Sequence, residues 1–135
     1  MIFWIASYPK SGNTWLRTLI SSYYYSDDGI YSENLIKRIR QFPEKMHFTD
    51  FDYNQNIVTD TSRFWIKAQE KINKDKKLKF FKTHNAFGAL NNNHFTDNKN
   101  SIGVIYIIRD PRNVITSLIN HYELDNEQAI KWMTN

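Results

Sequence analysis

The segment at residues 8–15, with the sequence YPKSGNTW, most constrains how this chain can fold. It follows an apolar run at residues 2–6 and precedes a segment whose apolar residues recur at helical spacing. This order predicts a strand, a tight loop and a helix. Such a loop directs backbone N–H groups and the positive end of the helix dipole at one point, which is a common way to hold a phosphate. The loop is therefore expected to bind an anion.

Four residues of the loop suit that role. Gly12 allows a tight turn and a close approach of the backbone, and Lys10 supplies a mobile positive charge. Ser11 and Thr14 offer hydroxyl groups. The common nucleotide triphosphate loop, G-x-x-x-x-G-K-[ST], places its lysine after the second glycine, whereas here Lys10 precedes the only glycine of the loop. A glycine turn without a ligand is the simpler alternative, but it would not need a lysine and two hydroxyls together.

The loop resembles the phosphosulfate-binding loop of sulfotransferases that use 3′-phosphoadenosine-5′-phosphosulfate (PAPS), whose usual sequence is YPKSGTTW. Only Asn13 departs from that sequence. The resemblance implies that Lys10 and the backbone of residues 11–14 hold the phosphosulfate, and that Trp15 stacks on adenine. Trp15 could equally belong to the core.

Two later segments are also predicted to be strands. Residues 78–83 precede His84, and residues 102–108 form a nearly continuous apolar run, which predicts a strand buried on both faces of a parallel sheet. With right-handed crossovers, these segments give an α/β fold in which a P-loop-like parallel sheet of about three core strands is flanked by helices. The loop, His84 and Arg109 then lie at one edge of the sheet, where ligands bind in such folds.

These strand ends carry two more motifs of the same family. Lys82-Thr83-His84 matches its K-T-H motif, which implies that His84 is the general base, that Lys82 assists the transferring group and that Lys10 stabilises the leaving phosphate. The family binds the 3′-phosphate with an arginine at a strand end and a serine eight positions later, here Arg109 and Ser117. Arg109 could instead pair with a carboxylate, and Ser117 could be a small helix residue facing the sheet.

Capping residues and helical periodicity predict the remaining elements. Helices are expected at about residues 14–24, from the N-cap Ser32 to Pro43, over 60–74, after an N-cap at Asp110, and from about 126 behind a capping box formed by Asp125 and Gln128. Residues 44–57 and 84–101 are predicted to be loops. Aromatic side chains in the first loop could shape an acceptor pocket or pack on the outer core.

Composition limits the function classes. The 18 Lys and Arg residues exceed the 14 Asp and Glu residues, and the net charge of +4 suits an anionic ligand but is too small to indicate nucleic acid. Cysteine is absent, which excludes disulfides and thiolate metal sites, and no other ligand cluster predicts a metal. The first apolar run is too short to span a membrane or to serve as a signal sequence. A cytoplasmic protein is expected.

The motifs together predict a PAPS-dependent sulfotransferase that acts on a hydroxyl or amine of a small-molecule, carbohydrate or lipid acceptor. Because the family's catalytic domain is considerably longer, residues 1–135 are expected to form a single sulfotransferase-type domain that lacks its C-terminal part. Either the chain is a fragment or a partner chain completes the nucleotide pocket. Open apolar faces and sheet edges also predict self-association or marginal stability. Two alternatives stay open: a non-catalytic nucleotide-binding fragment or interaction module, and a nucleotide-dependent phosphotransferase, against which the position of Lys10 argues.

Overall fold

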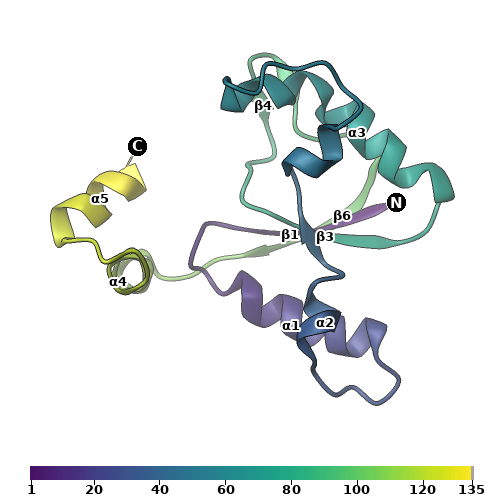
Figure 1. Cartoon of the computed structure of the whole chain (residues 1–135). Helices are drawn as coiled ribbons and strands as arrows, with labels where there is room; N and C mark the ends of the chain where they lie inside the picture. Colours follow the sequence, from purple (N-terminus) through teal and green to yellow (C-terminus); the bar gives the residue numbers. More distant parts are fainter. Residues whose placement is uncertain (135) are drawn as a thin grey trace.

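The computed structural model describes residues 1–134 and contains a four-stranded parallel sheet with the order β2-β3-β1-β6 (Figure 1). The strands are β1 (Ile2–Ser7), β2 (Arg40–Gln41), β3 (Lys79–Thr83) and β6 (Ser101–Ile107). β1 pairs with both β3 and β6, so the carboxyl ends of all three lie at one edge of the sheet. The predicted α/β class and the three predicted core strands are confirmed.

Helices cover the two faces of the sheet (Figure 1). α1 (Asn13–Tyr25) and α2 (Glu33–Ile36) lie on one face. The other face carries the 3₁₀ helices and turns, the helix and the small hairpin that follow in the chain: η1 (Lys45–Phe48), η2 (Val58–Phe64), α3 (Trp65–Ile72), η3 (Asn73–Asp75), β4 (Ala89–Leu90) and β5 (Asn93–His94). α4 (Pro111–Tyr122) and α5 (Asn126–Thr134) pack against each other and extend beside the sheet.

Two of the predicted helix starts are capped as expected. The carboxylate of Asp110 accepts a hydrogen bond from the backbone N–H of Arg112, and Pro111 occupies the first turn of α4. At the start of α5, Gln128 donates its backbone N–H to Asp125, whose own N–H donates to the Gln128 side chain. Ser32 precedes α2 but makes no side-chain cap.

The hydrophobic core lies between the sheet and α3. Trp4 packs against Phe95 with ring centroids 5.0 Å apart, and Phe42 contacts both of these rings and Phe81. Phe48, from the segment at residues 44–57, is 1% exposed and belongs to the same cluster. Of the two alternatives for the aromatic residues of that segment, packing on the core is therefore the one observed.

A buried chain of polar groups crosses this core. Gln69 on α3 donates to the carbonyl of Phe95 at 2.6 Å and accepts from Thr96 at 2.5 Å. Thr96 also shares a hydrogen bond of 2.6 Å with the hydroxyl of Ser101, which accepts from the indole N–H of Trp4. These hydrogen bonds pair the side chains of Gln69, Thr96, Ser101 and Trp4, and they tie α3 to β1 and β6.

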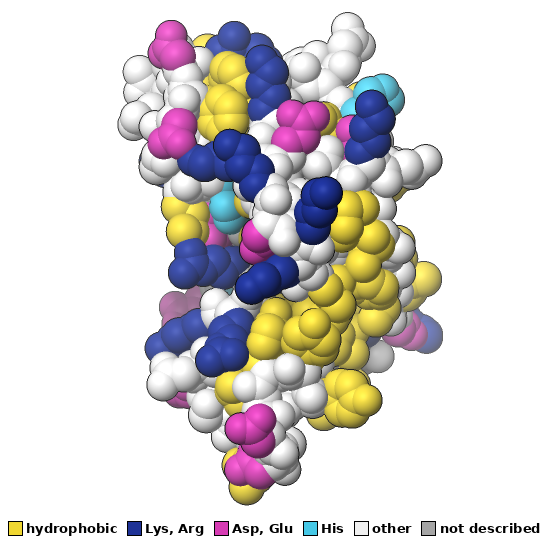
Figure 2. All heavy atoms as spheres, turned by 90° about the vertical axis from the view of Figure 1, so that its right-hand side faces the viewer, with side chains coloured by type: hydrophobic (Ala, Val, Ile, Leu, Met, Phe, Trp, Pro, Cys, Tyr) yellow, Lys and Arg dark blue, Asp and Glu magenta, His cyan; other side chains and the backbone are white. Residues whose placement is uncertain are grey.

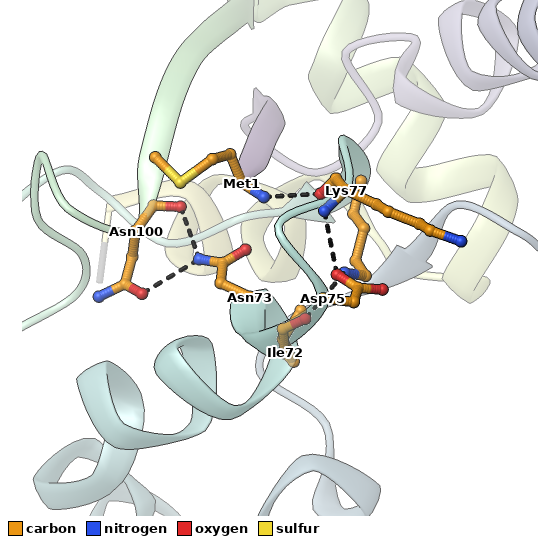
Figure 3. A network of polar contacts seen from close by, with 7 residues as sticks. Met1, Ile72, Asn73, Asp75, Lys77 and Asn100 are labelled. Carbon is orange, nitrogen blue, oxygen red and sulfur yellow. Dashed lines mark hydrogen bonds and ion pairs between the residues drawn. The ribbon is translucent and has the colours of Figure 1, made fainter.

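A second polar network holds the amino-terminal edge of the sheet (Figure 3). The α-ammonium of Met1 donates to the carbonyl of Lys77 at 2.6 Å, just before β3. The amide of Asn73 donates to the backbone carbonyl of Asn100 at 2.9 Å and to its side chain at 3.1 Å, just before β6. These bonds fix the strand starts relative to α3, so the register at the opposite edge is also set.

Some predictions of local structure are wrong. The predicted helix over residues 60–74 is α-helical only at Trp65–Ile72, because 3₁₀ segments precede and follow it. The predicted loops contain η1 and the β4–β5 hairpin. The helix expected from Ser32 to Pro43 is α-helical only at Glu33–Ile36, and its second half contains β2, whose two residues carry no strand pattern.

The expected burial of residues 102–108 is also wrong. β6 is an edge strand that pairs only with β1 in the described part of the chain, and Val104 and Tyr106 are 58% and 62% exposed. Figure 2 shows a broad group of hydrophobic side chains on the surface, in keeping with the predicted open apolar faces. No helix within residues 1–134 is long and apolar enough to cross a membrane.

Candidate functional site

The loop between β1 and α1 adopts the conformation that its sequence predicts for an anion site. Lys10 and Gly12 have left-handed backbone angles, with φ of 66° and 104°. Gly12 is the N-cap of α1 and no side chain caps this helix, so the N–H groups of its first turn stay open toward the loop. Backbone N–H groups next to left-handed residues form a concavity for anions, and the helix dipole adds to it.

Asn13 holds this loop on the sheet. Its buried side-chain amide donates to the carbonyl of Ile5 at 3.0 Å and to the hydroxyl of Ser7 at 3.1 Å. An amide group can make both bonds at once, which accounts for an asparagine at the position where the resembling loop has threonine. Because the side chain of Asn13 is occupied by these bonds, Asn13 can offer an anion only its backbone N–H, in the first turn of α1.

His84 stands beside the loop at the end of β3. Its Nδ1 lies 2.7 Å from the carbonyl oxygen of Ser7 and 3.4 Å from the hydroxyl of the same residue. Because a carbonyl oxygen only accepts, Nδ1 carries the proton and Nε2 keeps its lone pair. Partial burial lowers the pKa of His84, the bond to Ser7 opposes this, and the charges of Lys82 and Arg17 lower the pKa further. The ring is therefore neutral near pH 7 and can accept a proton at Nε2.

Lys82 and Arg17 add positive charge on the same side of the sheet. Burial lowers the pKa of Lys82, and the nearby charge of Arg17 lowers it further, against an opposing contribution from Glu44. Arg17 donates to the carbonyls of Ile36 and Ile39, at 3.2 and 2.5 Å, and so anchors α1 to the α2–β2 segment.

Arg109 reaches back to the first loop. Its guanidinium donates to the carbonyl of Lys10 at 3.0 Å, although the two residues are 99 positions apart. Among residues 1–134, Arg109 makes no ion pair, so the alternative of a carboxylate partner is not observed. Ser117 lies on α4, and no hydrogen bond in the described chain joins it to the loop.

The remaining loop residues differ in exposure. Ser11 is buried, Thr14 is exposed, and Trp15 is 71% exposed. Trp15 is thus not a core residue, and its indole is free to contact a ligand. The structure brings together Lys10, residues 11–15, His84 and Arg109, and leaves Ser117 apart.

Sequence analysis did not identify two residues near the site. Ser7, the last residue of β1, fixes the tautomer of His84, and Arg17 adds charge beside Lys82. Arg17 follows Asn13 by four positions, so both lie on one face of α1. That spacing was the available signal for Arg17, whereas the contact of Ser7 with His84 joins residues 77 positions apart and leaves no sequence pattern.

The lowered pKa of His84 can be measured directly. We expect its Cε1–H resonance in NMR spectra to titrate below the unperturbed value of about 6.5, and His84→Asn to remove that resonance and so assign it. A lowered pKa in the folded protein means that His84 binds its second ring proton more readily in the unfolded chain. Acidification below about pH 6.5 should therefore lower the free energy of unfolding. A midpoint at or above about 6.5 would contradict the proposed environment.

Comparison with known protein families identifies the family of this chain. No curated protein and no solved structure matches the chain. Among residues 1–134, no group of three or more His, Asp or Glu side chains could hold a metal ion. A family model described as a sulfotransferase domain matches residues 2–132, nearly the whole chain. The chain therefore belongs to the sulfotransferase domain family, whose members transfer sulfuryl groups.

Proposed function

We propose that this protein transfers the sulfuryl group of PAPS to a hydroxyl or amine of an acceptor molecule. The observation that carries the proposal is the convergence of three strand ends: the uncapped loop after β1, His84 after β3 and Arg109 after β6. All three lie at the carboxyl edge of the sheet, where parallel α/β sheets bind ligands. Family membership supports a sulfuryl transfer of this kind.

The loop suits a phosphosulfate. The open N–H groups at the start of α1 and the left-handed residues Lys10 and Gly12 provide donors for a 5′-phosphate. Arg109, exposed and bonded to the loop, would bind the 3′-phosphate, with Ser117 on α4 as its second proposed ligand, and the exposed indole of Trp15 would stack on adenine. Lys10, Lys82 and Arg109 would supply the positive charge for the two phosphates and the sulfuryl group.

In this reaction, the main contributions of these residues are to position the reactants and to stabilise developing charge. The acceptor oxygen forms a bond to sulfur while the bond from sulfur to the bridging oxygen breaks, and its electron pair stays on that oxygen. Lys10 stabilises the charge that builds there, and Lys82 stabilises the transferring group. Nε2 of His84, left unprotonated by the bond from Nδ1 to Ser7, takes the acceptor proton.

Binding of adenosine 3′,5′-bisphosphate, the nucleotide product, tests this proposal. We expect calorimetry without magnesium to detect binding, and Lys10→Ala and Arg109→Ala each to weaken it roughly tenfold or more, as expected for loss of a charged hydrogen-bond donor. Lys67→Ala on α3, exposed and on the other face of the sheet, removes the same charge and should change nothing.

Three results would contradict the proposal or favour an alternative. A folded chain that does not bind the bisphosphate, or that binds it equally in all variants, excludes the proposed nucleotide site. Tighter binding of ATP with magnesium would favour a phosphotransferase. Binding without turnover against a broad acceptor panel would favour a non-catalytic module.

A further inference from the structure

A basic cleft of about 490 Å³ opens beside the proposed base, between α1, the α2–β2 segment and β3. Its lining residues are Arg17, Lys37, Ile39, Arg40, Gln41, Glu44, Met46 and Lys82. Cationic residues thus outnumber carboxylates by four to one. A concave site lined by one sign of charge concentrates the field and attracts ligands of the opposite sign.

No ion pair within residues 1–134 neutralises the positive charge of this cleft, and the carboxylate of Glu44 offsets only part of it. None of the four cations has a carboxylate within ion-pair distance among residues 1–134. The carboxylate of Glu44 serves instead as the cap of η1 in a capping box with His47. The Nε–H of Arg17 is buried and has no hydrogen-bond partner, which is costly for a charged donor. A bound anion would pair with the exposed side chains of Lys37 and Arg40 and would compensate the charge of Arg17.

The cleft continues directly from the catalytic side of the sheet. Lys82 lines the cleft, and His84 follows it by two positions, just after β3, close enough for the charge of Lys82 to lower the pKa of His84. Arg17 lies one turn beyond Asn13 on α1, and the charges of Arg17 and Lys82 both reach His84. The cleft extends toward β2, whereas Arg109 and the proposed 3′-phosphate site lie on the opposite side, at β6.

We propose that this cleft binds the acceptor, and that the acceptor carries an anionic group, a carboxylate, sulfate ester or phosphate, in addition to the group that becomes sulfated. The inference rests on the proposed function, because His84 can serve the cleft only if it accepts the acceptor proton. Arg40, Lys37 and Arg17 hold the anionic group, and Lys82 stands between it and the transferring sulfuryl group. A neutral acceptor would leave these charges unpaired.

Inorganic sulfate is a suitable probe. In the chain saturated with adenosine 3′,5′-bisphosphate, sulfate replaces chloride at constant ionic strength, and amide shifts are followed by NMR. We expect saturable shifts at residues 37–41, and the double variant Lys37→Gln/Arg40→Gln should weaken sulfate binding by about tenfold. The matched variant Arg38→Gln/Lys45→Gln removes two nearby charges that do not line the cleft and should leave binding unchanged.

Three outcomes of the sulfate titration would overturn the inference. Shifts confined to the loop at Lys10 and to His84, and unchanged in both double variants, would mean that sulfate occupies only the transfer position. Equal weakening in both variants would indicate a diffuse surface effect, and no shifts would exclude an anion subsite. If the bisphosphate itself does not bind, the proposed nucleotide site fails separately, and sulfate titration of the free chain still reports on the cleft.

Discussion

Replacing His84 with asparagine should lower kcat for sulfuryl transfer by roughly 10²–10⁴-fold, the usual contribution of a positioned general base. The side-chain amide of asparagine can replace the hydrogen bond that Nδ1 of His84 donates to the Ser7 carbonyl, 2.7 Å away. It has no basic nitrogen in place of Nε2 and cannot take the acceptor proton. Binding of adenosine 3′,5′-bisphosphate should be unchanged, because the phosphate-binding groups belong to the first loop and to Arg109.

The measurement is release of the bisphosphate from PAPS with an acceptor that supports turnover. His94→Asn makes the same substitution at an exposed histidine in β5 and should retain full activity. The wild-type rate should fall at acid pH with an apparent pKa below about 6.5, because protonation removes the base, and this limb should be absent in His84→Asn. A variant that keeps its rate would exclude His84 as the base.

The parts of the fold that local sequence encodes were predictable. The loop lies between an apolar strand and a helix, and Gly12 within it readily adopts the left-handed backbone angles that a tight turn needs. These local features were sufficient to predict the conformation of the loop. The start of α4 is equally local, because Asp110 and Pro111 act on the next few residues. Parallel pairing followed from the strand-helix order, which brought the motifs to one edge.

Features that depend on long-range packing were not predictable. The apolar run of β6 has the pattern of a buried central strand, yet its burial depends on what pairs with its free edge. The charge around Lys82 depends on α1 crossing the sheet near β3, which brings Arg17 close. The spacing of neighbouring residues predicts neither the exposure of β6 nor the position of Arg17 near Lys82.

Phe42 is the clearest residue of this second kind, and its replacement should have the largest effect on stability. It follows the two-residue strand β2, at a position where a helix end was expected, and is 0% exposed. Its ring contacts Trp4, Phe48, Phe81 and Phe95, and its N–H donates to the carbonyl of Lys82 at 2.9 Å. Phe42→Ala is expected to lower the free energy of unfolding by about 3–5 kcal/mol.

That loss is a large part of the roughly 5–15 kcal/mol that stabilises a domain, so urea unfolding should show a lower midpoint or no folded baseline. Phe87→Ala is the matched control, because Phe87 is 83% exposed and its removal should cost less than about 0.5 kcal/mol. Equal stability of the two variants would mean that this aromatic cluster is not the core. The Phe42 ring also packs against Phe81, the neighbour of Lys82 in β3, so a folded Phe42→Ala protein should bind sulfate in the basic cleft more weakly, whereas Phe87→Ala should not.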